Sequence, residues 1–98
     1  MIYVIATMNI KPGTREKVLA AAQPCIQATR KETGCIFYDL NTSATDPNLL
    51  TFVERWESRD HLAAHAKTDH IKAWRAASGD HVVSRVIEII TPASVDKM

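Results

Sequence analysis

Apolar residues alternate with polar ones along four short stretches of the chain, a pattern typical of β-strands. The stretches span residues 2–10, 35–43, 49–57 and 82–91. In the first, alternate positions form an apolar set on one face: Ile2, Val4, Ala6, Met8 and Ile10. The first and last stretches begin apolar on both faces, so we expect both of their faces to be covered. Strand-ending signals follow the first, second and last stretches: Lys11-Pro12-Gly13, Asp46-Pro47-Asn48 and Pro92.

Two intervening stretches have the three-to-four-residue apolar spacing of amphipathic helices. The first covers residues 17–33, begins after Thr14 as an N-cap, and carries the stripe Val18, Leu19, Ala22, Cys25, Ile26 and Thr29. Pro24 predicts a kink within it, and Gly34 fits the position after its C-terminus. The second begins after Ser58 and ends at Gly79, and Thr68-Asp69 is a point where it can restart.

The resulting order, β-α-β-β-α-β, predicts an α+β fold of the ferredoxin-like type, with an antiparallel four-stranded sheet and the helices on one face. We assign residues 1–92 to one domain and residues 93–98 to a C-terminal tail. Helices on one face leave the apolar positions of the other face uncovered. Because large exposed apolar patches mark interfaces, we expect a homodimer that packs sheet against sheet.

Composition narrows the class of protein further. The 98 residues are 46% hydrophobic and 23% charged, with a net charge of +1. This balance gives no basic surface for a nucleic-acid partner and no apolar run long enough for a membrane. No export signal is recognisable at the N-terminus, so we expect a cytoplasmic location. Cys25 and Cys35 are expected to be reduced thiols within the fold, although they could pair.

His65 is the strongest candidate for chemistry, because an imidazole beside Leu62 and Ala66 faces inward and exchanges protons near neutral pH. Asp69, one helical turn later, could orient it. The alternative is a histidine at the edge of the core that is hydrogen-bonded to backbone. Glu54 lies in an apolar strand face, where a structural role with Arg85 as its partner is the simpler interpretation.

Other chemistries find little support in the sequence. His61 and His65 have the spacing of a helical metal pair, but the glutamate of the HExxH motif is absent, so no metal site is expected. There is no G-x-S-x-G element for a nucleophilic serine. The three glycines are isolated, which excludes a phosphate-binding loop, so no nucleotide cofactor is expected.

Several motifs together resemble the antibiotic biosynthesis monooxygenase family, over residues 1–91. They are Lys11-Pro12-Gly13-Thr14, Glu32-Thr33-Gly34-Cys35, Phe37-Tyr38-Asp39-Leu40, Phe52-Val53-Glu54-Arg55-Trp56-Glu57-Ser58, Leu62 with His65, and Thr68-x-His70-Ile71. The resemblance implies a dimeric α+β barrel of ferredoxin-like subunits. It also implies a monooxygenase without a cofactor, in which an electron-rich quinol or anthrone, once deprotonated, reduces molecular oxygen.

The chain departs from particular branches of that family. Anthrone oxygenases carry Asn where this chain has Phe52, which weakens the match to their chemistry. The haem-degrading branch uses Asn, Trp and an axial His, and the corresponding residues here are Ala6, His65 and Arg75. Haem degradation is therefore not expected. Another branch of the family processes phosphorylated signalling molecules, and Arg75 and Lys72 leave a match to that branch open.

We therefore predict an apolar cleft between sheet and helices that binds a small aromatic substrate and molecular oxygen. His65 is the predicted catalytic residue, and no cofactor is expected. The predicted substrate-binding residues are Trp56, Tyr38, Asn9, Phe52, Trp74 and Arg75. Two alternatives remain on the same scaffold: a non-oxidative enzyme such as an isomerase, and a non-catalytic dimer that binds a small ligand.

Overall fold

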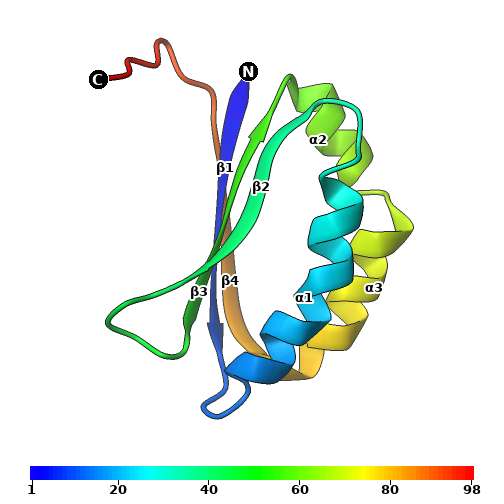
Figure 1. The fold of residues 1–98 in the computed structure, drawn as a ribbon, viewed down its shortest axis with the longest axis vertical. Coiled ribbons are helices and arrows are strands. Elements are labelled where there is room, and N and C mark those ends of the chain that lie inside the picture. Colours follow the sequence, from blue (N-terminus) through cyan, green and yellow to red (C-terminus); the bar gives the residue numbers. More distant parts are fainter.

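Four antiparallel strands form one sheet, and all the helices lie on one side of it (Figure 1). This computed structural model describes all 98 residues. The sheet order is β2-β3-β1-β4, formed by β1 (Ile2–Ile10), β2 (Cys35–Thr42), β3 (Leu49–Trp56) and β4 (Val82–Ile90). The helices are α1 (Arg15–Thr29), α2 (Arg59–His65) and α3 (Asp69–Ser78), and a short 3-10 turn (Gly79–His81) leads into β4. The predicted ferredoxin-like α+β fold is confirmed.

The core lies between the helices and the covered face of the sheet, as the alternation predicted. On β1 every even-numbered residue is buried, and the odd-numbered ones are partly or fully exposed. Cross-strand neighbours continue this buried face, since Val4 pairs with Glu54 and Ala6 pairs with Phe52. From the helices, the core receives Val18, Ala22, Cys25, Ile26, Ile71 and Trp74.

The predicted second helix is two helices, because the chain restarts at Thr68. The Ser58 side chain accepts a hydrogen bond from the His61 amide at the start of α2, and Thr68 does the same for Ile71 at the start of α3. Both are N-caps that satisfy amides without a helical partner. Thr14 precedes α1 but makes no such bond, because its hydroxyl donates to the Lys11 carbonyl 2.6 Å away.

The first helix ends earlier than predicted. It continues through Pro24 but stops at Thr29, so the residues up to Gly34 form turns instead of a last helical turn. Gly34 therefore is not the residue after a helix. It adopts φ +85° immediately before β2, and a Cβ atom added there would lie 2.2 Å from Cγ of His61. Glycine thus lets this turn, which also carries Glu32, pack closely against α2.

The opposite face of the sheet carries no helix (Figure 1). Phe37, Val86 and Ile90 are 39%, 61% and 42% exposed, and they project from this face because of their strand register. The edge strand β4 is exposed along most of its length. None of the helices combines the length and apolar composition that a membrane span requires.

Candidate active site

A cavity of about 230 Å³ lies between the covered face of the sheet and helices α2 and α3. Its walls are mostly apolar, and its polar groups come from a small set of side chains: Tyr38, Glu54, His65, Arg75 and Arg85. Apolar walls with a few polar groups are typical of small-molecule sites. Of the predicted site residues, the structure brings His65, Tyr38, Phe52, Trp74 and Arg75 together around this cavity.

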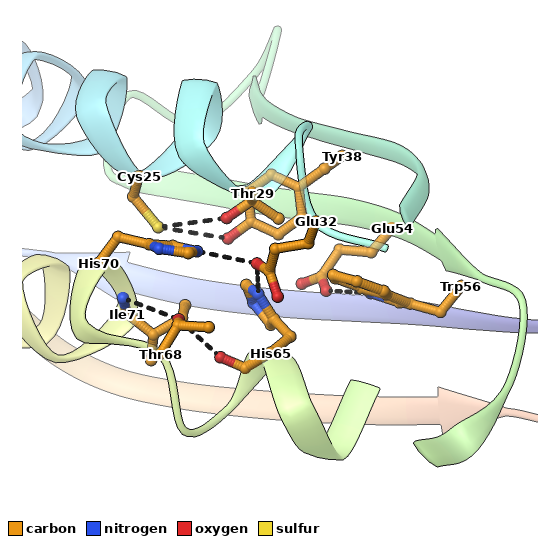
Figure 2. Close-up of polar contacts among 10 residues, drawn as sticks. All are labelled: Cys25, Thr29, Glu32, Tyr38, Glu54, Trp56, His65, Thr68, His70 and Ile71. Atoms are coloured by element: carbon orange, nitrogen blue, oxygen red, sulfur yellow. Dashed lines mark hydrogen bonds and ion pairs between the residues drawn. The ribbon is translucent and has the colours of Figure 1, made fainter. Parts of the chain in front are cut away.

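His65 is held by a carboxylate that lies far away in the sequence. Its Nδ1 lies 2.6 Å from Oε2 of Glu32, and the same oxygen lies 2.8 Å from Nε2 of His70 (Figure 2). The predicted partner, Asp69, is exposed and makes no side-chain bond to His65, because the chain turns between α2 and α3 and places Asp69 at the solvent side. When Nδ1 donates to Glu32, Nε2 of the neutral ring is left as an acceptor.

The environment of His65 favours the neutral ring. The residue is 4% exposed, and desolvation lowers its pKa below the ordinary value, while the bond to Glu32 acts in the opposite direction. The positive charge of Arg75 also lowers this pKa. The rings of Trp56 and Tyr38 enclose the imidazole, with centroids 4.8 and 5.4 Å away. His65 is therefore a buried proton acceptor in an aromatic wall.

Glu54 is a second titratable group in the cavity wall. It is 6% exposed, and its Oε1 accepts a hydrogen bond from Trp56 Nε1 at 2.9 Å (Figure 2). The sequence suggested Arg85 as its partner, but Arg85 projects from the edge strand and forms no ion pair with it. Desolvation raises the pKa of Glu54 to about 7, because one indole bond does not replace the lost water.

Two predicted binding residues do not line the cavity. Trp56 is completely buried behind it, where it packs on His65 and bonds Glu54. Asn9 lies on the other face of the sheet, because strand alternation directs odd-numbered residues of β1 away from the helices, and its amide donates to the Ser84 hydroxyl. Trp74 and Phe52 do line it and pack edge-to-face, with ring centroids 5.6 Å apart.

Tyr38 presents its ring to the cavity but anchors its hydroxyl in the core. The hydroxyl lies 3.9 Å from Sγ of Cys25, and that sulfur lies 3.8 Å from the Thr29 hydroxyl. Burial raises the pKa of Tyr38 far above its ordinary value, so this phenol stays protonated. Cys25 and Cys35 are free thiols, and burial raises the pKa of both above the ordinary thiol value. Neither has the depressed pKa of a nucleophilic cysteine.

The only cluster with metal-ligand chemistry consists of Glu32, His65 and His70, whose donor atoms lie within 4.8 Å of one another. Two imidazoles and a carboxylate form a ligand set that divalent ions accept. Here, however, both imidazoles already lie at hydrogen-bond distance from the Glu32 carboxylate. The sequence pair His61 and His65 does not form a site, because His61 Nδ1 faces the Ser58 hydroxyl at 2.7 Å.

Comparison with known proteins identifies the family. The model of the family described as "Antibiotic biosynthesis monooxygenase" matches residues 1–77. The chain belongs to the antibiotic biosynthesis monooxygenase family. It is 31% identical over 102 aligned residues to a protein of Escherichia coli, "Probable quinol monooxygenase YgiN", with 94% of this chain and 98% of that protein covered.

Two solved structures superimpose on nearly all of the chain. The structure of Rv0793 from Mycobacterium tuberculosis has a TM-score of 0.88 and 31% identity, and 98% of each chain is covered. A protein from Nitrosomonas europaea has a TM-score of 0.91 and 25% identity, with 96% of this chain and all of the other covered. These comparisons confirm the family resemblance that the sequence motifs indicated.

Glu32 is the residue that sequence reasoning overlooked. It stands in the motif Glu32-Thr33-Gly34-Cys35, but it is 33 residues from His65, and no spacing rule connects the two. From the sequence it was named only as part of this motif and given no role of its own. The available signal was Gly34, two residues after Glu32. Its left-handed turn packs against α2, and this packing fixes the direction of the residues before the turn.

Proposed function

We propose that this protein is a cofactor-independent monooxygenase that oxidises a small, electron-rich aromatic of the quinol or anthrone type with molecular oxygen. The observation that carries the proposal is His65, a buried imidazole on an apolar cavity with Nδ1 held by a carboxylate. Membership of the family and the name of the E. coli relative support the reaction class.

In the proposed mechanism, Nε2 of His65 accepts the proton of a ring hydroxyl. Glu32 keeps the other proton on Nδ1, so the base stays in the competent tautomer. The resulting phenolate is a much stronger reductant than the phenol, and it transfers electrons to oxygen within the apolar cavity. The protein orients the substrate and excludes water from it, because Phe52 and Trp74 form apolar walls of the cavity.

The reaction balances without an external reductant. A hydroquinone and one oxygen molecule give a hydroxyquinone and one water. The ring supplies all the electrons that oxygen takes up, partly through hydroxylation and partly through conversion of quinol to quinone. Glu54, whose pKa lies near 7, is the group that can return a proton to the departing oxygen atom at neutral pH.

Cavity size limits the substrate. A cavity of ~150 Å³ suffices for benzene, and this one measures about 230 Å³. We therefore propose a substrate with one or two rings, which favours quinols over the three rings of an anthrone. Phe52, in the place where anthrone oxygenases carry Asn, agrees with this preference.

We also propose a homodimer through the uncovered face of the sheet. Apolar side chains project from this face with nothing over them, including Val86 at 61% exposure and Ile90 at 42%. A Val86→Lys substitution places charges in that interface, so sedimentation should show monomers. Ala63→Lys, on the exposed outside of α2, is the control and should leave the dimer intact. A dimer that survives Val86→Lys would contradict this interface.

The deciding experiment measures oxygen uptake by chelator-treated protein with a panel of hydroquinones and anthrones. We expect uptake above autoxidation, and a loss of about 100-fold or more in His65→Ala. Turnover that continues without oxygen would instead indicate a non-oxidative enzyme. Ligand binding with no turnover would indicate a binding module. A loss of activity on chelation would overturn cofactor independence and draw attention to the Glu32–His65–His70 cluster.

A further inference from the structure

Two arginines stand at the mouth of the cavity without a partner. Arg75 comes from α3 and Arg85 from β4, both line the cavity, and both are exposed residues. Neither guanidinium forms an ion pair with a carboxylate or a side-chain hydrogen bond anywhere in the structure. The arrangement brings two positive charges from different elements to one opening.

The other acidic and basic residues that line the cavity, Glu54 and His65, both have hydrogen-bond partners. Glu32 is bonded by two imidazoles, Glu54 by the indole of Trp56, and Arg30 lies 3.4 Å from the Asp39 carboxylate. Glu54 lines the same cavity as the two arginines, but no ion pair joins it to either of them. Among the acidic and basic residues that line the cavity, Arg75 and Arg85 are therefore the two without a hydrogen-bond or ion-pair partner.

The two arginines also act on each other. The pKa of Arg85 lies below its ordinary value, first because of burial and then because of the positive charge of Arg75. The same charge lowers the pKa of His65. Like charges held close together cost free energy, and an anion between them removes that cost. Guanidinium groups bind carboxylate and phosphate oxygens through paired, planar hydrogen bonds, which makes them suited to this task.

We propose that Arg75 and Arg85 bind an oxyanion substituent, a carboxylate or a phosphate, carried by the aromatic substrate. The ring then lies in the apolar cavity, the anion lies at its mouth, and a ring hydroxyl reaches His65 at the buried end. This proposal rests on the proposed function for the identity of the ring, but the anion site can be measured without turnover.

The test uses calorimetric titration of the wild-type protein with three unreactive ring compounds: benzoate, phenyl phosphate and benzamide. Benzamide is the neutral match of benzoate in size and shape. We expect benzoate or phenyl phosphate to bind at least about tenfold more tightly than benzamide, with an affinity that falls as salt is added. The tighter of the two anions identifies the substituent as carboxylate or phosphate. Equal affinities for all three compounds would overturn the proposal.

Matched variants locate the effect. Arg75→Gln and Arg85→Gln should each weaken the anion by about tenfold and leave benzamide unchanged, whereas lysine at either position should restore part of the affinity. Lys67→Gln is the control, because Lys67 is an exposed lysine in the turn between α2 and α3 that does not line the cavity. An equal loss in Lys67→Gln would show general attraction to the surface and overturn the site. Thermal unfolding of each variant establishes that it is folded.

The two proposals fail differently. If no quinol is oxidised but the anions still bind through both arginines, the oxygenase is wrong and the anion site stands. If neutral hydroquinones are oxidised as efficiently as 2,5-dihydroxybenzoate, and neither arginine variant changes KM, the oxygenase stands and the anion site is wrong.

Discussion

Glu32 and Glu54 are both largely buried carboxyl groups at the candidate active site, but their surroundings differ. Two imidazoles bond one oxygen of Glu32, at 2.6 and 2.8 Å, whereas Glu54 receives only the indole N–H of Trp56. The fixed carboxylate can orient a base. The other, with a pKa raised to about 7, can take up or release a proton near neutral pH. Deep burial with a single hydrogen bond lets Glu54 exchange a proton near neutral pH, whereas the two imidazoles that bond Glu32 suit it to orienting a base.

The largest predicted difference between Glu32 and Glu54 should appear in kcat when Glu32 is replaced, as in Glu32→Ala. Two imidazoles then lose their common acceptor, so His65 is free to rotate and to change tautomer. Under the proposed mechanism, kcat for quinol oxidation should fall about 100-fold while KM changes little, since the cavity walls remain. Stability should also fall, by about 1–3 kcal/mol, because two partly buried N–H groups are left unpaired.

Glu32→Asp and Glu57→Gln complete this experiment. Glu32→Asp keeps the charge and should recover part of the lost kcat, which identifies Glu32 as a positioning residue. Glu57→Gln removes an exposed carboxylate and should change neither kcat nor stability. If Glu32→Ala retained full kcat, the orienting role would be refuted.

The next prediction concerns pH and Glu54. Its pKa is about 7 in the folded protein, against an ordinary value of 4.5, so the folded state binds more protons between these values. The resulting stabilisation is complete below about pH 4.5 and is lost as the pH rises through 7, up to about 3 kcal/mol in total. Glu54→Gln removes this loss, so the variant should gain stability relative to wild type as the pH rises.

Urea unfolding of the wild type and of Glu54→Gln, at several pH values between about 5 and 8, measures the difference in stability between them. His65 acts with the opposite sign: its folded pKa is lowered, so its contribution is present above the unfolded pKa and is lost as the pH falls. Both proteins retain His65, and its contribution therefore cancels in the difference between them. Parallel stability curves for the two proteins would show that Glu54 is not the titrating group.

The same contrast shows what sequence could and could not predict. Strand alternation correctly predicted that Glu54 lies on the buried face of β3, and helical spacing predicted that His65 faces inward from α2. Both predictions succeeded because they depend on local periodicity. The hydrogen bond between Glu32 and His65 depends on the turn that follows α1, which ends earlier than predicted. It also depends on close packing between two residues that are 33 positions apart in the sequence. The two cavity arginines likewise meet only in three dimensions, because one lies on a helix and the other on an edge strand.

The smallest effect tests the turn that carries Glu32, through two glycines with nearly the same backbone angle. Gly34 has φ +85° and Gly13 has φ +81°, but a Cβ atom at Gly34 would meet the His61 ring at 2.2 Å, whereas nothing lies within 4 Å of Gly13. Gly13→Ala should therefore cost only the backbone strain, about 1 kcal/mol, and Gly34→Ala about 1–2 kcal/mol more. Because the displaced His61 belongs to α2, Gly34→Ala should also lower kcat, whereas Gly13→Ala should not. Equal losses of stability in urea unfolding would show that backbone strain alone governs this turn, and that its packing against α2 does not hold Glu32 in place.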